Sequence, residues 1–250
     1  MRRSFLPLFV LLVVTLRAAG ADILFTAATE AELQPLLAKM TDVRTESRAG
    51  WQFWLGTLGP RRVVLTRTEG DPLNAVAATT LAIRRYAPRL VVSYGAARPH
   101  DPALQAGDVV LSREFAAFDG MVSPHRDLGT GTAPLTWHPL LHPLMTPGEE
   151  ETHQAHFPAD PAVLAAAQKL TAPRGRLVPG VLGSAHQVNR EADRIAYLRT
   201  QWRTDTEDGE SAHVAGCALL LGVPAFGLRV IDGQPGEAAA LVLQLLEVLP

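Results

Sequence analysis

Residues 90–97 read Leu-Val-Val-Ser-Tyr-Gly-Ala-Ala and open on a short, nearly continuous apolar run, Leu90–Ser93. Such runs are typical of a strand that is buried on both faces of a parallel sheet. Residues 72–86, just before this strand, have the periodicity of an amphipathic helix. The apolar positions that define this helix are Leu73, Val76, Ala77, Thr80 and Leu81.

Further elements extend this pattern in both directions along the chain. Apolar runs predict strands over 23–26, 51–58, 62–66, 108–112 and 225–231. Helical periodicity predicts helices over 30–40, 161–170, 190–202, 210–221 and 237–249. Because strands alternate with helices, the chain is predicted to form one α/β domain with a largely parallel sheet.

The amino-acid composition of the chain argues against several classes of protein. The chain has 250 residues, with 23 Lys and Arg against 25 Asp and Glu, and a single cysteine. This near-neutral balance, without a block of basic residues, argues against a nucleic-acid partner. The lone cysteine, Cys217, excludes an intramolecular disulfide framework and a multi-cysteine zinc site, and we expect it to be a small buried residue.

The first 21 residues have the pattern of a secretory signal peptide. Two arginines precede an apolar run over 6–16, and Ala19-Gly20-Ala21 provides the small residues of a cleavage site. The run is short for a permanent membrane anchor, although an uncleaved anchor is the alternative. We therefore expect a mature domain over 22–250 that is periplasmic or secreted and has no stable membrane anchor.

Residues 121–160 do not follow the alternation of predicted strands and helices. They contain several prolines and histidines and show little periodicity. A long irregular segment in a compact domain is typically functional, an interface element or locally disordered. Its histidines lack the spacing of a metal-binding motif, so we interpret them as surface or loop residues. The histidines that invite the metal interpretation are His138, His142, His153 and His156. We predict no metal and no organic cofactor.

Three segments carry recognisable motifs. Residues 23–33 read Ile-Leu-Phe-Thr-Ala-Ala-Thr-Glu-Ala-Glu-Leu; residues 104–110 read Leu-Gln-Ala-Gly-Asp-Val-Val; and residues 207–212 read Glu-Asp-Gly-Glu-Ser-Ala. In this order they resemble the nucleoside phosphorylase/hydrolase superfamily, and within it the methylthioadenosine/S-adenosylhomocysteine nucleosidases. The family has Gly-Ala-Met-Glu-Glu-Glu, Leu-x-x-Gly-Asp-Val-Val and Glu-Met-Glu-Ala in these places. The resemblance implies a three-layer α/β/α sandwich around a mixed sheet and hydrolysis of the N-glycosidic bond of adenine nucleosides.

The resemblance implies catalytic and ribose-binding roles for two glutamates. Glu32 matches the glutamate that activates water; from the local pattern alone it is a solvated glutamate in the first turn of a helix. Glu210 matches the glutamate that binds the 2′ and 3′ hydroxyls of ribose, and its alternative is an ordinary acid at a helix N-terminus. The family's preceding methionine is Gly209 here, so we expect the loss of an apolar contact below the ribose.

Asp232 is the third candidate. Relatives have Arg-x-Ile-Ser-Asp, whose aspartate hydrogen-bonds N7 of the purine and acts as the general acid, whereas this chain has Arg229-Val230-Ile231-Asp232-Gly233. Either Asp232 acts as the acid, or it occupies the place of the serine and the acid is missing. A one-residue slip in an extended segment turns a side chain to the other face. A third interpretation is a turn-initiating aspartate before Gly233.

The expected base pocket departs from the family pattern at several positions. Gln187 and Val188 match the segment that holds the purine edge, where the family often has a stacking aromatic in place of Gln187. Ala96 replaces a serine in the family's Gly-Ser-Ala-Gly loop, which begins at Gly95, and Arg98 stands where a glycine is expected. Arg229, in the run Leu228-Arg229-Val230-Ile231-Asp232, completes the expected set of substrate-binding residues.

Hydrolysis is favoured over phosphorolysis. Phosphorylases of this superfamily bind phosphate with arginines near the first loop and before the Gly-Ser loop. This chain has no arginine in 23–32, and Ser93-Tyr94 precedes Gly95. Asp71, at the second glycine of the family's Thr-Gly-x-Gly turn, would repel phosphate if it lined the pocket. Arg98 is the residue that would support a phosphorylase.

A non-catalytic nucleoside-binding relative of the same fold is the competing interpretation, and convergence of Glu32, Glu210 and Asp232 on one crevice would argue against it. The resemblance also implies a homodimer in which a loop after Phe118 closes the neighbouring pocket. The stretch after Asp232 is shorter than the family's lid. We therefore predict an open site that residues 233–237 do not cover.

Overall fold

The computed structural model describes residues 20–146, 148 and 151–249, so the expected signal peptide lies almost entirely outside the described residues. A 10-stranded mixed sheet forms its centre, in the order β11-β6-β12-β13-β5-β1-β4-β3-β2, with β14 pairing both β5 and β6. The strands of this sheet are β1 (Ile23–Ala27), β2 (Thr41–Arg48), β3 (Trp51–Leu58), β4 (Arg61–Arg67), β5 (Leu90–Pro99), β6 (Val109–Ala117), β11 (His156–Pro158), β12 (Leu177–Ser184), β13 (Thr206–Asp208) and β14 (Ala225–Ile231).

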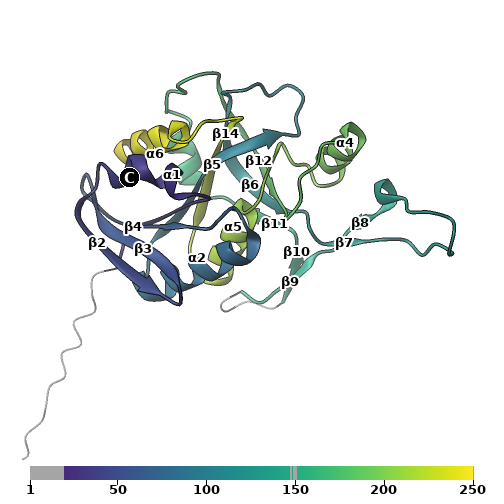
Figure 1. Cartoon of the computed structure of the whole chain (residues 1–250), viewed down its shortest axis with the longest axis horizontal. Coiled ribbons are helices and arrows are strands. Elements are labelled where there is room, and N and C mark those ends of the chain that lie inside the picture. The colour runs from purple at the N-terminus through teal and green to yellow at the C-terminus, as the bar shows by residue number, and fades with distance from the viewer. Residues whose placement is uncertain (1–19, 147, 149–150, 250) are drawn as a thin grey trace, which may run out of the picture.

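Helices cover both faces of the sheet, which confirms the three-layer α/β/α sandwich (Figure 1). Helices α1, α3 and α6 pack together on one face, and α2 and α5 pack against each other on the opposite face. The helices are α1 (Glu30–Leu37), α2 (Pro72–Tyr86), α3 (Pro161–Ala167), α4 (Ala192–Gln201), α5 (Ser211–Leu220) and α6 (Glu237–Val248).

The parallel strands lie at the centre of the sheet. β5 pairs in parallel with β1 on one side and with β14 on the other, and its residues Val91, Val92 and Tyr94 are fully buried, as the apolar run predicts. The strand continues to Pro99, well beyond the predicted end. Because parallel strands end at the same edge, the residues that follow β1, β5 and β14 are brought close together.

Helix α2 has the predicted bounds but not the predicted buried face. Leu73 and Val76, two members of the predicted apolar stripe, are 81% and 42% exposed. The buried face is instead formed mainly by small residues, which let α2 approach α5 closely, at the point where Thr80 Oγ1 lies 3.1 Å from the buried Cys217 Sγ. The buried side chains of α2 are Pro72, Ala75, Ala78, Thr79, Ala82, Ile83 and Tyr86.

Four strands of the sheet were not predicted from the sequence: β2, β11, β12 and β13. β2 is an edge strand whose side chains are nearly all exposed, so it carries no apolar alternation. β12 contains Pro179 and two glycines, which are typical of turns, and β13 is a short polar segment. β2 forms a hairpin with the next strand, β3, whereas the places of β11, β12 and β13 in the sheet depend on pairing partners far away in the chain.

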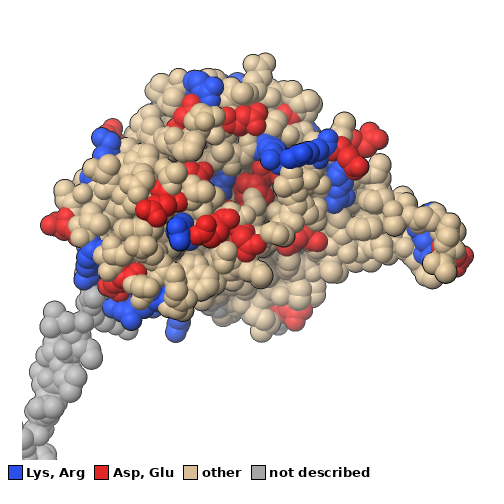
Figure 2. Space-filling view, viewed as in Figure 1, with Lys and Arg blue, Asp and Glu red and all other residues tan. Residues whose placement is uncertain are grey.

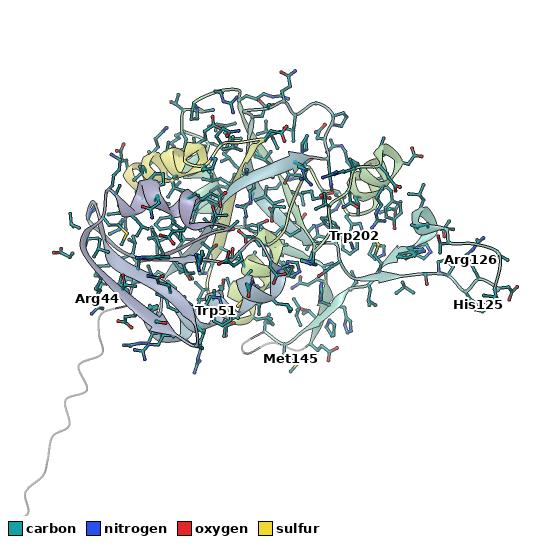
Figure 3. The ribbon with its side chains drawn as sticks, viewed as in Figure 1. Arg44, Trp51, His125, Arg126, Met145 and Trp202 are labelled. Carbon is teal, nitrogen blue, oxygen red and sulfur yellow. The ribbon has the colours of Figure 1, made fainter. Side chains whose placement is uncertain are left out.

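The described residues between 121 and 154 form an arm that projects from the body of the molecule, with His125 and Arg126 at its tip (Figures 1 and 3), whereas β11 joins the central sheet. The arm contains two small strand pairs, and its base packs on a second apolar cluster that includes Trp202 and Phe118. Its short elements are β7 (Met121–Val122), β8 (His138–Pro139), β9 (His142–Leu144), β10 (Thr152–Gln154) and the 3-10 turn Pro134–Thr136.

Two searches of the described residues bear on the expectations about metals and membranes. Within residues 20–146, 148 and 151–249, no group of three or more His, Cys, Asp or Glu side chains is placed to hold a metal ion. In the same residues, no helix has the length and apolar character needed to cross a membrane.

Candidate functional site

One cavity of about 550 Å³ opens at the edge where β1, β5 and β14 end. All of the residues predicted for catalysis and substrate binding line it: Glu32, Gly95, Ala96, Gln187, Val188, Gly209, Glu210, Arg229 and Asp232. The structure therefore brings the three candidate carboxylates to one space, as an active site requires. None of residues 233–237 lines the cavity, in agreement with the short connection after Asp232.

Strand β5 runs along the cavity. We call the end of the cavity beside Ser93 its inner end and the end beside Arg98 its outer end. At the inner end, Ser93 Oγ accepts a hydrogen bond from Arg229 Nη2 at 2.9 Å. At the outer end, the Ala97 carbonyl accepts from the backbone N–H of Asp232 at 3.0 Å, and Arg98 follows. A strand advances about 3.3 Å per residue, so Ser93 and Arg98 are about 16 Å apart along the strand.

The inner end is built on a buried ion pair between Arg229 and Asp208. Arg229 is only 1% exposed, and its Nε lies 3.1 Å from Asp208 Oδ2. Burial raises the pKa of the Asp208 carboxyl, but the Arg229 charge and hydrogen bonds from Ser211 and Glu210 outweigh it, so that pKa lies below its ordinary value. Arg229 is thus largely neutralised and serves to position its neighbours.

Glu210 lies beside this pair and is 2% exposed. One of its oxygens accepts a hydrogen bond from Thr68 Oγ1, and the other lies 3.8 Å from Arg229 Nη2. Burial raises the pKa of Glu210 to about 7, because the Arg229 charge and the Thr68 hydroxyl offset only part of the desolvation. Glu210 stands at the N-cap of α5, as the alternative interpretation expects, but its side chain makes no capping hydrogen bond and lines the cavity.

Glu32 both caps a helix and faces the cavity. Its Oε2 accepts hydrogen bonds from the N–H of Thr29 at 3.0 Å and from the Thr29 hydroxyl at 3.2 Å, which forms a capping box at the start of α1. Its Oε1 lies over Gly95, where an added Cβ would sit 2.9 Å from that oxygen. The Tyr94 hydroxyl donates to the Glu32 carbonyl at 3.2 Å. The capping role and the cavity-facing position therefore coexist.

Asp232 lines the outer end of the cavity. Its backbone has φ 47°, a left-handed conformation that aspartate tolerates better than most residues. This turn directly after β14 places Asp232 in the cavity lining. Of the two registers considered for Asp232, the structure shows one in which the residue reaches the cavity.

A buried network that the sequence did not reveal holds the segment 187–189. Glu207 accepts hydrogen bonds from the backbone N–H of Asn189 at 3.0 Å and from the Asn189 side chain, and lies 3.1 Å from His100 Nε2. Burial raises the pKa of Glu207, but the bonds from His100 and Asn189 outweigh it and lower that pKa. Because these partners are far apart in sequence, no local signal points to them.

Glu207→Ala is expected to loosen segment 186–190 and to lower the free energy of unfolding by about 3 kcal/mol, since the buried His100 loses its carboxylate partner. Hydrogen exchange would show faster exchange of the Asn189 amide, and urea unfolding would report the lost stability. Glu191→Ala, which removes an exposed glutamate that makes no capping bond, is the matched control. Unchanged exchange at Asn189 would contradict the assigned role of Glu207.

Gly209 is required by the close approach of another loop. A Cβ built on Gly209 collides with the carbonyl oxygen of Gly70, which itself lines the cavity. The family's methionine therefore has no room here, and the lost apolar contact is replaced by the backbone of the Thr68–Asp71 turn. The sequence showed the substitution but not the reason for it.

Gly209→Ala is expected to lower the free energy of unfolding by about 1–3 kcal/mol, because the backbone of Gly70 cannot move away as a flexible side chain can. Urea unfolding measures this loss. A variant as stable as the parent protein would show that the turn shifts freely.

Two expectations about phosphate are revised by the structure. Asp71 does not line the cavity: its Oδ1 caps α2 by accepting from Leu73 and Asn74, and its Oδ2 lies 3.2 Å from His186 Nδ1. Arg98 does line the cavity, at its outer end, away from Ser93. An arginine is thus present, but not in the place where the resemblance puts the phosphate.

Comparisons with known proteins show which proteins this chain is similar to. The 5′-methylthioadenosine/S-adenosylhomocysteine nucleosidases of Marinomonas sp. (strain MWYL1) and Bacillus cereus (strain G9842) are each 27% identical, over 215 and 213 residues, with 84% of both chains covered. Among solved structures, the nucleosidase of Colwellia psychrerythraea 34H in complex with adenine has a TM-score of 0.73 at 24% identity, covering 92% of this chain and 96% of its own. A futalosine hydrolase mutant of Helicobacter pylori has a TM-score of 0.70 at 20% identity, with coverage of 92% and 98%.

The similarity to these two solved structures establishes the fold. The family model described as the Phosphorylase superfamily matches residues 22–247, which is nearly the whole of the described chain. The motifs, the order of the strands and this match lead to one conclusion: the chain belongs to the phosphorylase superfamily.

Proposed function

We propose that this protein hydrolyses the N-glycosidic bond of adenine nucleosides such as methylthioadenosine or S-adenosylhomocysteine. The observation that carries the proposal is the arrangement of Glu32, Glu210 and Asp232 around one cavity, spaced along β5. The names of the relatives and the adenine bound to one of them support the substrate class. The same arrangement argues against a non-catalytic relative that only keeps the fold.

Glu210 binds the ribose in this proposal. An ionised carboxylate accepts hydrogen bonds from both the 2′ and 3′ hydroxyls, and its charge stabilises the positive charge that grows on the sugar ring. Its buried position beside Arg229 and Thr68 holds it in one orientation. The sugar therefore lies at the inner end of the cavity.

Glu32 activates the attacking water. Its oxygen over Gly95 faces the middle of the cavity, next to the expected position of the anomeric carbon. The water oxygen forms a bond to C1′ while Glu32 accepts a water proton, and the C1′–N9 bond breaks with its electron pair passing to the purine. Asp232 lies at the base's end and assists its departure.

Phosphate is not required in this proposal. The cavity is lined by five carboxylates, Glu32, Glu207, Asp208, Glu210 and Asp232, and its buried arginine is already paired with Asp208. A phosphate dianion next to Glu32 and Glu210 would meet like charges without a free cation at the inner end.

Release of the free base from purified protein tests the proposal: adenine from methylthioadenosine, S-adenosylhomocysteine and adenosine, and hypoxanthine from inosine, each with and without phosphate. We expect release of adenine that does not depend on phosphate. Release only in the presence of phosphate would identify a phosphorylase, and the absence of release by folded protein would support a non-catalytic relative.

A homodimer is part of the proposal. An apolar cavity of about 270 Å³ lies between α2, α5 and the base of the arm, next to the exposed Val76. The shaft of the arm presents a mainly uncharged surface (Figure 2). Its exposed apolar side chains are Val122, Leu128, Leu135, Leu140, Leu141 and Met145. A second copy would cover these groups, and sedimentation equilibrium distinguishes dimer from monomer.

We also propose that the protein is exported from the cytoplasm. The signal-like pattern over 1–21 leads us to place the mature protein in the periplasm or outside the cell. Fractionation followed by N-terminal sequencing is expected to give a chain that starts at Asp22 in the exported fraction. Recovery of the full chain from the cytoplasm would contradict it.

A further inference from the structure

The outer end of the cavity holds two charged side chains that have no partner among the described residues, Arg98 and Asp232. The other charged residues of the lining are engaged elsewhere: Glu32 in the capping box, Glu207 with His100 and Asn189, Arg229 with Asp208, and His186 with Asp71. Unpaired charges of opposite sign at one end of a cavity are suited to a ligand edge that offers both a donor and an acceptor.

The sheet register makes Arg98 and Asp232 neighbours. Ile231 pairs with Ala97 in the parallel register of β14 and β5, and the Asp232 N–H donates to the Ala97 carbonyl. Ala97 is buried while Arg98 is exposed, so the Arg98 side chain is on the open side of the strand. Glu207, which is opposite Arg98 in the antiparallel pairing with β13, is already bonded to other residues. The Arg98 guanidinium is therefore available to a ligand.

We propose that Arg98 and Asp232 together bind the N6–N7 edge of the adenine: Asp232 accepts a hydrogen bond from the N6 amine, and Arg98 donates one to N7. This inference rests on the proposed function and refines it: Arg98, instead of Asp232, stabilises the departing base, and Asp232 recognises that base. Adenine presents a donor at N6 beside an acceptor at N7, the pattern that a single amide side chain reads in nucleic-acid recognition. Here an acceptor and a donor from two strands supply the same pattern with charged groups, which form the stronger hydrogen bonds.

The contact to N7 also bears on catalysis. When the C1′–N9 bond breaks, its electron pair enters the purine ring and negative charge appears at N7. The guanidinium stabilises this charge by donating a hydrogen bond, and it keeps its own proton, since arginine stays protonated in proteins. The departing purine then takes a proton from solvent, while Glu32 returns the proton of the attacking water to solvent. The sum is nucleoside plus water giving adenine plus the free sugar.

Binding to the slow variant Glu32→Gln tests the contact independently of turnover. The probes are adenosine and tubercidin, its 7-deaza analogue, which lacks only the N7 acceptor. We expect tubercidin to bind about tenfold more weakly than adenosine, and Arg98→Met to remove this difference by weakening adenosine alone. Equal binding of the two probes, or an equal loss of both in Arg98→Met, would overturn the proposal.

Kinetics provide the second test, in the Glu32-containing protein. Arg98→Met is expected to lower kcat for adenosine about 100-fold, and Arg98→Lys to restore part of it. Hydrolysis of p-nitrophenyl β-D-ribofuranoside, whose leaving group has no N7, is expected to change less than about threefold. Equal losses on both substrates would mean that Arg98 acts on the fold or the sugar and not on the base.

Asp232→Asn separates the two roles considered for that residue. An asparagine can still accept from N6 and can turn its amide to donate to the O6 of inosine, so we expect adenosine hydrolysis to persist and the preference for adenosine over inosine to shrink. A large and equal loss of hydrolysis for adenosine and inosine would assign Asp232 as the general acid and overturn its place in the proposal. Arg113→Met, on the exposed part of β6 and outside the cavity, is the matched control for Arg98→Met. If the parent protein releases no base from any nucleoside, the proposed function fails, while the binding comparison still decides the role of Arg98.

Discussion

Glu32→Gln is expected to lower kcat by about 10³-fold while nucleoside affinity changes by less than about threefold. The amide cannot accept a proton from water, but it keeps the size of the side chain: its one oxygen accepts from the Thr29 N–H, and its NH2 group takes the place of the oxygen that faces Gly95. Steady-state kinetics measure the loss of turnover, and equilibrium binding measures the retained affinity. The two results together separate a group that acts on the reacting water from one that only shapes the cavity.

The fold is expected to withstand this change, because glutamine also completes a capping box at the start of α1. Glu30→Gln is the matched control: Glu30 lies in the same first turn, points to Arg67 instead of the cavity, and is expected to be replaceable without loss of activity. Equal activity of the two variants would remove Glu32 from the mechanism.

Glu210→Gln is expected to lower kcat/KM by about 10²-fold. The neutral amide offers the ribose one acceptor oxygen instead of two and provides no charge to the transition state. Because burial raises the pKa of Glu210 to about 7, the ionised form of the parent protein grows as the pH rises through that value. The kcat/KM of the parent protein is therefore expected to rise over this range and that of the variant to stay flat. A flat profile for both would show that ionisation of Glu210 does not matter.

The same substitution is expected to stabilise the fold at high pH. A raised carboxyl pKa means that the folded state holds a proton that the unfolded state has released, so stability falls as the pH rises from the ordinary value of 4.5 to about 7 and stays low above it. This difference in pKa corresponds to about 3 kcal/mol. Urea unfolding should show Glu210→Gln close to the parent protein near about pH 4 and more stable by about this amount near about pH 8.

Glu191→Gln makes the same chemical change at an exposed site and is expected to leave the pH dependence unaltered. A Glu210→Gln variant that is less stable than the parent protein at high pH would mean that the Thr68 and Arg229 contacts outweigh the cost of burying the charge. In that case the pKa of Glu210 would lie below its ordinary value and not above it.

Much of the fold follows from short-range patterns. The run Ala225–Ile231 is a strand with the predicted bounds, because its apolar side chains are buried on both faces. Helix α2 starts where Asp71 and Pro72 predict, since the aspartate caps the first turn and proline suits that position. Its buried face could not be predicted, because alanines and a threonine carry little periodic signal and the larger Leu73 and Val76 point away from the core.

Some residues of the candidate site could likewise be predicted from the sequence, and others could not. Glu32, Glu210 and Asp232 were found through motifs, because their neighbours in the chain are characteristic. Thr68, Asp208 and His100, which hold these or nearby groups in place, have no local signature. Each acts on a partner from a distant segment, so its role appears only when the segments are paired.

The limits of helices, strands and caps depend on contacts within a few residues, and the order of amino acids therefore specifies them directly. The charge state of Glu210, the neutralisation of Arg229 by Asp208, and the unpaired state of Arg98 depend instead on which strands lie side by side. β5, β13 and β14 meet in the sheet although long stretches of chain separate them. Burial and pairing of charges arise from that meeting, because desolvation and Coulomb attraction act through space and not along the chain.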